Sequence, residues 1–380
     1  MLKDISRNIR REVERELWGR SAGRCEFNGC NRPLFKSPVT EERVHISEKA
    51  HIYSFSEYGP RGWGPYASSP DGINDADNLM LVCHDCHTTI DQDVDGQRYS
   101  AELLMRWKKE HENRISISTG VNPSKKSHVV LYGANIGEQH SLLQGEEAKD
   151  ALFPDWYPAE GRPIVISMNW EGKDSDSAYW QTEAKNLIAA FDRQIGALIN
   201  EGVTSHFSIF SLAPIPLMTL FGSLLTDKVP ARTYQLHREP VQTWKWLKGP
   251  QDFAFQINRP RSNDRAPALV LSLSAHIDPS RVVSVIGESV SIWELTIEHP
   301  HNDFLRSEEQ LVLFREAVRH LIAKIGDVHG KNVPLSIFPA IPVACAVELG
   351  RIRMPKADSP WILYDQSNKL GGFVRTIGIQ

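Results

Sequence analysis

The sequence contains no long hydrophobic run. No apolar stretch reaches the roughly 18 residues that a membrane-spanning helix needs. The first residues, MLKDISRNIRREVERELW, also lack the apolar core of a secretory signal. These absences predict a cytoplasmic protein without a membrane partner, and 380 residues suit two or three domains.

Cysteine is scarce, with five residues in the chain. Clustered cysteines in a reducing compartment favour a metal site over disulfides. Cys345 stands alone in an apolar run and is most simply a core residue. The C-terminal two thirds also lack a nucleophile elbow, a Walker loop and a GxGxxG fingerprint, so they do not indicate an enzyme of those classes.

An excess of positive charge is missing too, because the formal net charge is −4. Residues 1–36 nevertheless carry nine Lys and Arg against five acids, a local charge of +4, so the remainder sums to −8. Ile5, Ile9, Val13 and Leu17 recur every fourth residue, which predicts an amphipathic helix with arginines on its other faces. This basic segment suits a nucleic-acid backbone, and a solvated helix face is the alternative.

Four of the cysteines form two close pairs. Cys25 and Cys30 lie in CEFNGC, and Cys83 and Cys86 lie in LVCHDCH. Thiolates suit zinc, and four of them form a closed site with no open position. The pairs therefore predict a structural Zn²⁺ site that closes a loop of about fifty residues and stabilises a module with little core.

Three polar residues between and beside these pairs are candidates for phosphodiester hydrolysis. That reaction needs a base to deprotonate water and a divalent cation to stabilise charge. His51 lies on a predicted strand and is the candidate base. Asn78 precedes the apolar run LMLV and is placed to orient His51 by a hydrogen bond. His87 follows Cys86 and is the candidate ligand of a catalytic Mg²⁺.

This order of a cysteine pair, His, Asn and C-x-x-C-H resembles the HNH, or ββα-metal, endonucleases over roughly residues 20–92. The resemblance implies that His51 activates water, Asn78 orients it, and His87 binds the catalytic metal. Many members place an acidic metal ligand immediately before the base, and here that position is Ala50. Glu48, two residues earlier on the same strand face, and Asp91 are the two alternatives.

The remaining chain alternates apolar strands with amphipathic helices, which predicts an α/β fold with a parallel or mixed sheet. Adding 128 to a position in one half finds its counterpart in the other: Phe210 and Phe338, Pro214 and Pro342, Gly222 and Gly350. We therefore expect a metal module at 1–117, a linker at 118–127 and a duplicated domain at 128–380, with repeats of about 128–250 and 265–380.

The duplicated region resembles the SAVED domain, a fusion of two CARF-like units. The segments that carry this likeness include FSLAP, SAHID, EHPHND and FPAIPVACAVELGRIRMPK. An HNH module before a SAVED domain resembles the effector nucleases of bacterial CBASS antiphage systems. The resemblance implies a cyclic di- or trinucleotide as activator, homo-oligomer assembly on activation and degradation of double-stranded DNA.

A cyclic nucleotide needs stacking surfaces for its bases and donors for its phosphates. Ligands of α/β sheets bind beyond the carboxyl ends of the strands. The loops at predicted strand ends supply these candidate binding residues: Tyr132, Asn135, Asn169, Trp170, Lys173, Ser211, His276 and Pro339.

Two other functions fit parts of the sequence. A restriction-type HNH endonuclease would use its C-terminal half to read DNA and would need no small molecule. A zinc-dependent DNA-binding regulator would keep its function after replacement of His51. The duplicated half favours the messenger-gated nuclease, because a bilobed cleft suits a pseudo-symmetric cyclic ligand.

Overall fold

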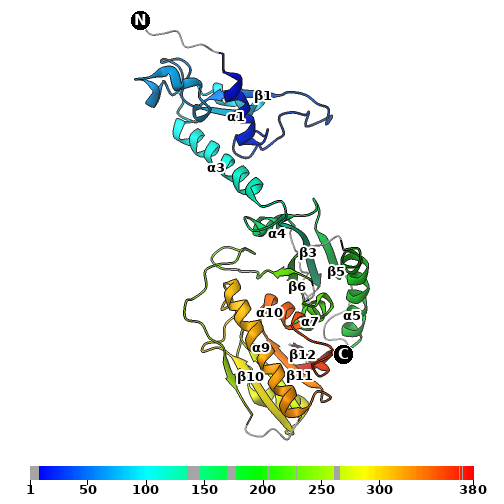
Figure 1. The fold of residues 1–380 in the computed structure, drawn as a ribbon. Helices are drawn as coiled ribbons and strands as arrows, with labels where there is room; N and C mark the ends of the chain where they lie inside the picture. The colour runs from blue at the N-terminus through cyan, green and yellow to red at the C-terminus, as the bar shows by residue number, and fades with distance from the viewer. Residues whose placement is uncertain are drawn as a thin grey trace. The chain divides into compact units, whose positions relative to one another are not determined.

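The computed structural model divides the chain into two compact units, Met1–Val121 and Asn122–Gln380 (Figure 1). It describes residues 8–134, 145–168, 177–202, 206–227, 229–260, 266–367, 369 and 371–380. Four of the candidate ligand-binding residues, Asn135, Asn169, Trp170 and Lys173, lie outside these ranges. Among the described residues, every helix is too short or too polar to cross a bilayer.

The first unit is built around a two-stranded antiparallel sheet followed directly by a helix. Its elements are α1 (Arg11–Ser21), β1 (Ser47–His51), three 3-10 turns η1 (Gly64–Tyr66), η2 (Pro70–Asn74) and η3 (Ala76–Asn78), β2 (Leu79–Cys83), α2 (His84–Asp91) and α3 (Ala101–Gly120). In the sheet, His51 pairs with Leu79, and Ser47 pairs with Cys83. This β1–β2–α2 order is the predicted ββα arrangement.

Burial in the first unit follows the sequence pattern. Val13 and Leu17 form the buried stripe of α1, as their four-residue spacing predicts. Every residue of β2 is buried. Leu34 and Leu104 complete the small core with these strands and helices.

The second unit contains two α/β halves, of which the first has a parallel sheet and the second a mixed sheet. The first half comprises β3 (Lys126–Ala134), α4 (Gly145–Leu152), β4 (Tyr157–Pro158), β5 (Ile164–Met168), α5 (Ser177–Phe191), a π-helical segment η4 (Asp192–Gly196), α6 (Ala197–Asn200), β6 (Phe207–Leu212), α7 (Ile215–Leu225) and β7 (Ala231–Thr233). Its strands follow the order β4-β3-β6-β7, with β5 also paired to β3.

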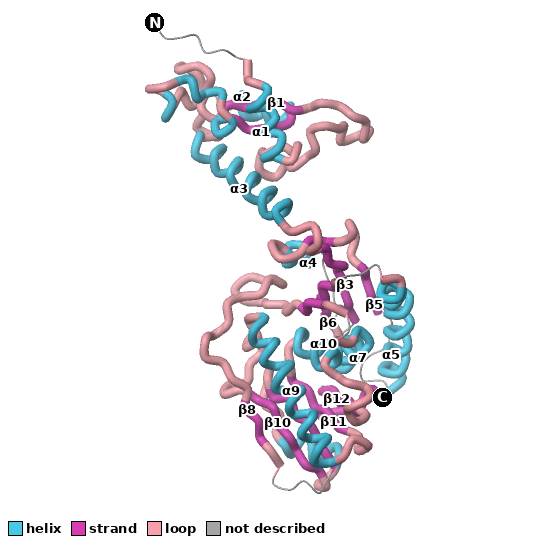
Figure 2. The backbone as a smooth tube through the Cα atoms, viewed as in Figure 1, coloured by secondary structure: helices cyan, strands magenta, loops and turns pink. Residues whose placement is uncertain are grey.

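The second half repeats this plan with an antiparallel strand at each edge. It comprises β8 (Gln256–Asn258), β9 (Ala266–Ser272), α8 (Pro279–Ile286), β10 (Val290–Thr296), α9 (Glu308–His329), β11 (Leu335–Ala340), α10 (Val343–Arg351), β12 (Trp361–Ser367) and β13 (Gly372–Ile379). The order is β13-β12-β11-β9-β10-β8, and α9 runs along this sheet (Figure 2). The α/β class and the two fused units are therefore confirmed.

The two halves meet at α7 and α10, which lie side by side (Figure 1). A Cβ on Gly222 of α7 would lie 1.9 Å from the carbonyl oxygen of Val347, and a Cβ on Gly350 of α10 would lie 1.9 Å from that of Thr219. Since 222 + 128 is 350 and 219 + 128 is 347, each helix makes the same contact with the other. Only glycine permits so close a backbone approach.

A buried ion pair within α10 also hydrogen-bonds to the first half. Arg351 Nη1 lies 2.6 Å from Glu348 Oε1, and both side chains are almost fully buried. Arg351 also donates to the carbonyls of Val229 and Ala231, at 3.3 Å each. Thr233 Oγ1 donates to Glu348 at 2.6 Å. Helix α10 thus fixes the path of β7 from the other half.

Candidate functional site

Four cysteine side chains converge in the first unit. The Sγ atoms of Cys25, Cys30, Cys83 and Cys86 all lie within 4.8 Å of one another. Cys25 and Cys30 come from the loop after α1, whereas Cys83 ends β2 and Cys86 lies in the first turn of α2. Within the described ranges, no other group of three or more His, Cys, Asp or Glu side chains has the spacing to hold a metal ion.

The chemistry of this cluster calls for a cation. Burial raises the pKa of the Cys25 thiol to about 12. Its thiol therefore ionises near neutral pH only when a positive charge lies beside it. The Sγ atoms of Cys30 and Cys83 lie 3.9 Å apart, close to the roughly 3.8 Å edge of a tetrahedron with metal–sulfur bonds of about 2.3 Å. The four residues therefore fit a tetrahedral metal ion.

The candidate base His51 is the last residue of β1, and its side chain is hydrogen-bonded to a residue that the sequence analysis did not predict as its partner. Its Nε2 atom lies 3.0 Å from Oδ1 of Asn74, the last residue of η2. Its ring also packs edge-on against Phe55, with the centroids 5.9 Å apart. Asn74 lies in an irregular 27-residue connection between β1 and β2 (residues 52–78), where spacing gives no indication of which side chain meets the histidine.

Asn78 has a different contact from the one expected. Its fully buried side chain accepts from the backbone N–H of Tyr53 at 2.8 Å. It donates to the carbonyls of Tyr53 at 3.0 Å and Ile73 at 2.9 Å. The prediction of a direct hydrogen bond from Asn78 to His51 is therefore wrong, because these backbone groups are the partners of the Asn78 amide. Asn78 instead joins the segment after β1 to the end of η2, because its amide can satisfy three backbone groups at once.

His87 lies on α2 with a carboxylate partner. Its Nδ1 atom is 3.3 Å from Oδ2 of Asp91, one helical turn away. The charge of Asp91 also raises the pKa of His51, so the three side chains share one neighbourhood. Asp91 is therefore the better placed of the two candidate acidic ligands.

Glu48 faces away from this neighbourhood. Successive side chains of a strand alternate between its faces, so Glu48 and His51 lie on opposite faces of β1. The Glu48 carboxylate lies 3.7 Å from Nδ1 of His84, inside the C-x-x-C segment. The contacts of the two carboxylates therefore favour Asp91 over Glu48 as the candidate acidic ligand, and both assignments stay predictions.

The electrostatics suit His51 as a base. Burial lowers the pKa of His51, its hydrogen bond with Asn74 opposes this effect, and His87 lowers the pKa further. The imidazole is therefore neutral near neutral pH and can accept a proton. Arg61 fixes the backbone here, donating from Nη2 to the His51 carbonyl at 3.3 Å and from Nε to the Ile52 carbonyl at 2.6 Å.

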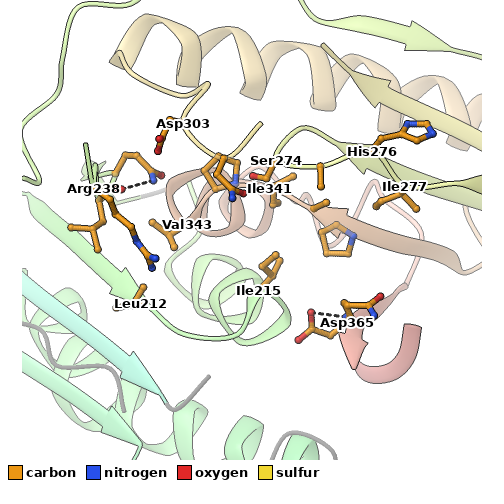
Figure 3. Close-up of a pocket in the computed structure, with 18 of the residues that line it drawn as sticks. Leu212, Ile215, Arg238, Ser274, His276, Ile277, Asp303, Ile341, Val343 and Asp365 are labelled. Carbon is orange, nitrogen blue, oxygen red and sulfur yellow. Dashed lines mark hydrogen bonds between the residues drawn. The ribbon is translucent and has the colours of Figure 1, made fainter. Parts of the chain in front are cut away.

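The second unit contains a cavity of about 650 Å³ between its two halves (Figure 3). This volume falls in the usual range for a small-molecule site, roughly 300–1,000 Å³. The wall joins strand ends and helix starts from both halves, and its residues include Leu212, Ile215, Gln235, Arg238, Glu239, Ser274, His276, Ile277, Arg281, Asp303, Pro339, Ile341, Val343, Asp365, Gln366 and Phe373.

The cavity wall carries charges of both signs and two helix N-termini. Ile215 and Val343, the first residues of α7 and α10, both line it, and helix N-termini favour anions. Arg281 lies over the Phe373 ring, 4.8 Å from its centroid, and donates to Gln366. Arg238 lies on the opposite side of the cavity from His276 (Figure 3).

The candidate ligand-binding residues divide between the cavity and the core. His276 and Pro339 line the cavity. Tyr132 is fully buried and stacks on Phe221, with the ring centroids 5.1 Å apart. Ser211 is also fully buried, and its hydroxyl has no hydrogen-bond partner. Tyr132 and Ser211 both lie on the core face of their sheet, because successive strand residues alternate between its two faces. A position near the end of a strand does not by itself tell which face a ligand would contact.

Sequence reasoning missed the charged groups of the wall, which are Arg238, Glu239, Arg281, Asp303 and Asp365. The 128-residue offset offered one signal, because it relates Arg238 to Gln366, and both line the cavity. The offset gives no such signal for Arg281, which lies in α8. Its pseudo-equivalent position, 153, lies just after α4.

Much of the basic N-terminal charge is already paired. Arg20 Nη1 lies 2.7 Å from Asp77 Oδ1, Arg32 Nη1 lies 2.8 Å from Asp85 Oδ2, and Arg10 Nη2 lies 3.4 Å from Asp75 Oδ1. These contacts hold α1 and the cysteine loops against the sheet module. The local charge of +4 therefore overstates the positive charge free for a partner.

Two family models match the chain. Residues 187–379 match the sensor domain described as SMODS-associated and fused to various effectors, abbreviated SAVED. This match covers 193 of the 380 residues, which is more than half. The chain belongs to the SAVED family. Residues 25–94 match an HNH endonuclease model, so an HNH domain precedes the SAVED domain, as the motifs indicated.

Solved structures also resemble the chain. The Cap4 SAVED/CARF-domain containing receptor of Acinetobacter baumannii with the cyclic trinucleotide 2'3'3'-cAAA has a TM-score of 0.41 and 13% identity, over 72% of this chain and 55% of that chain. The Moraxella osloensis Cap4 receptor has a TM-score of 0.39 and 13% identity, over 74% of this chain and 61% of that chain. The chain thus spans less than two thirds of these receptors. No curated protein matches it.

Proposed function

We propose that the chain is a metal-dependent endonuclease that cuts double-stranded DNA when its SAVED domain binds a cyclic oligonucleotide. The observation that carries the nuclease part is the neutral, hydrogen-bonded His51 beside His87 and Asp91, within the HNH match. The sequence resemblance to CBASS effectors supports a role as an antiphage effector acting in the cytoplasm.

The cysteine cluster is proposed to hold a structural Zn²⁺. Zinc prefers four tetrahedral ligands and binds thiolates well. Cys25, Cys30, Cys83 and Cys86 supply four thiols at the right spacing and leave no position for substrate. The ion would therefore hold β2, α2 and the loop after α1 in register, so that His51 and His87 keep their positions.

His87 and Asp91 are proposed to hold the catalytic Mg²⁺. Magnesium keeps several waters and uses one or two protein ligands together with substrate phosphates, so a pair of side chains suffices. When bound, the cation supplies stabilisation of the negative charge that develops on the phosphate and the leaving oxygen. His51 takes the proton from the attacking water.

The cavity between the SAVED halves is proposed to hold the cyclic oligonucleotide. Two helix N-termini suit its phosphates, and Arg281 over Phe373 offers a charged, flat surface for a base. Binding that favours an assembled state of several copies would bring HNH domains together on DNA. Such gating is a population shift that requires tighter binding to the assembled state.

Plasmid cleavage in Mg²⁺ buffer with a panel of cyclic di- and trinucleotides tests this function. One nucleotide should switch on cleavage, and His51→Ala should abolish it. Arg281→Ala should raise the nucleotide concentration needed by about 10-fold or more, since a charge-assisted hydrogen bond contributes about 1.5–3 kcal/mol. Arg193→Ala, at an exposed position outside the cavity wall, is the matched control.

The other outcomes identify the alternatives. Equal cleavage without any nucleotide would contradict gating and favour a restriction-type enzyme. Binding of DNA by the zinc-loaded protein without cleavage under any condition would contradict the nuclease and favour a DNA-binding regulator.

A further inference from the structure

The side chain of Asn74 contacts the imidazole of His51 directly, with Oδ1 and Nε2 3.0 Å apart. Asn74 is half-buried at the end of η2, and the preceding residue, Ile73, is fully buried. The carbonyl of Ile73 accepts a hydrogen bond from Asn78 Nδ2 at 2.9 Å. Asn78 therefore holds the backbone from which Asn74 reaches the histidine.

The chemistry of this contact decides the tautomer of His51. A carboxamide oxygen accepts hydrogen bonds and cannot donate them. A neutral imidazole carries its proton on one nitrogen and a lone pair on the other. With Nε2–H donated to Asn74, the lone pair lies on Nδ1. A general base must present a lone pair to the water that it deprotonates.

We propose that Asn74 is a positioning residue for the nuclease reaction: it fixes His51 in the Nε2–H tautomer and leaves Nδ1 to accept the proton of water. This inference rests on the proposed function. Asn78, the asparagine of the HNH motif, then acts on His51 only through the backbone and Asn74. The charged and titratable groups around His51 are His87 and Asp91 of α2 and Arg61, whose guanidinium bonds the His51 carbonyl.

The proton balance of the step is simple. Nδ1 of His51 takes a proton as the water oxygen forms its bond to phosphorus and the bond from phosphorus to a sugar oxygen breaks. The leaving oxygen takes a proton from solvent, and the imidazolium later returns its proton to solvent. The Nε2–H bond to Asn74 persists throughout and stabilises the imidazolium, since both ring nitrogens of the charged form are donors.

Nuclear magnetic resonance on the full chain tests the tautomer without any need for activity. Histidines labelled with ¹⁵N report which ring nitrogen carries the proton, and loss of a signal in His51→Gln assigns it to His51. We expect Nε2–H in the wild type and in Asn74→Asp, which keeps an acceptor oxygen. Asn74→Leu, of similar size without an acceptor, should show a mixture. A wild-type Nδ1–H form, or an unchanged signal in Asn74→Leu, would overturn the proposal.

Cleavage kinetics test the consequence for the reaction. Asn74→Leu should lower kcat by roughly 10- to 100-fold with KM unchanged, a part of the contribution of a general base, and Asn74→Asp should restore most of it. Asn113→Leu, at an exposed position of α3, is the control for the exchange itself. Bound zinc and the melting temperature report folding in each variant.

The positioning role of Asn74 and the nuclease activity can be overturned independently. If the wild type cuts activated DNA and Asn74→Leu cuts equally fast, the positioning role is overturned and the nuclease stands. If the wild type cuts nothing with any activator, the proposed function is overturned, and the ¹⁵N spectra still decide whether Asn74 sets the tautomer.

Discussion

Different interactions are expected to stabilise the SAVED domain and the HNH domain. In the SAVED domain one apolar core runs from Val130 in β3 to Ile379 in β13, across both halves. In the HNH domain the core cluster is small and includes Cys25 and Cys83 themselves. Small modules bury too little surface to be stable alone and use metal ions instead. The nuclease site is therefore expected to depend on a bound ion, and the sensor on packing.

Removal of the metal should give the largest effect. Cys83→Ala removes one of four ligands, and structural zinc in small modules contributes about 10–16 kcal/mol. We expect the HNH domain to unfold while the SAVED domain melts as in the wild type, which calorimetry and a strong chelator can show. Cys345→Ala, in the SAVED core, is the control and should lower only the SAVED transition. Joint melting of both domains in Cys83→Ala would contradict the comparison.

The helix crossing is the corresponding weak point of the SAVED domain. Gly222→Ala places a methyl group 1.9 Å from a backbone carbonyl, which cannot yield without moving α10. Overpacking of this kind costs about 1–3 kcal/mol or more, so denaturant unfolding should show a less stable SAVED domain. Gly326→Ala in α9 is matched, because its nearest neighbour is 3.9 Å away, and should be neutral or stabilising. If Gly222→Ala left the stability unchanged, the backbones of α7 and α10 would not be in such close contact.

A smaller and graded effect is expected from acid. Burial lowers the pKa of His206 to about 4, and its ring stacks on Trp156 at 3.5 Å between centroids. In the unfolded chain His206 has a pKa near 6.5, so between about pH 6.5 and pH 4 it binds a proton that folded His206 does not bind. Stability of the SAVED domain should therefore decline as the pH falls from about 6.5 towards about 4. His206→Phe keeps the stack and should flatten this decline in melting curves. An equal slope in the two proteins would exclude His206 as the cause.

The smallest effect should come from a surface ion pair of the HNH domain. Asp77→Asn breaks the 2.7 Å contact with Arg20, but the side chains are 76% and 36% exposed. Exposed pairs contribute about 0.2–1 kcal/mol and are screened by salt. We expect a shift in melting temperature near the error of the measurement, at low and high salt alike. A large loss would show that this ion pair stabilises the domain more than its exposure predicts.

The fold and the cysteine cluster could be predicted from the sequence because they depend on runs and spacings of neighbouring residues. The runs LMLVC and HVVLY became buried strands, and the offset of 128 relates β6 to β11 residue by residue. The four cysteines converge because Glu26, between Cys25 and Cys30, exchanges two hydrogen bonds with Leu81 of β2 and so places this loop beside Cys83.

Contacts within the irregular connections could not be predicted in the same way. Asn74 and Asn78 lie four residues apart in one loop, and only the fold shows which of them reaches His51. The choice between Glu48 and Asp91 also needed the fold, because spacing by two places Glu48 on the strand face of Ala50, whereas Asp91 pairs with His87 on α2. Arg238 and Arg281 come from elements whose mutual approach depends on how the two halves pack.

The duplicated halves do not offer identical surfaces to whatever fills the cavity. Gln235 Oε1 accepts from the N–H of Ala344 at the start of α10, at 3.2 Å. The equivalent positions 128 residues away are Leu363 and Pro216, and proline has no N–H to donate. Of these four residues Gln235 alone lines the cavity, so this amide has no counterpart from the other half there. A ring with two unlike bases would therefore sit in the cavity preferentially in one of its two orientations, whereas a ring with twofold symmetry would gain nothing from turning over.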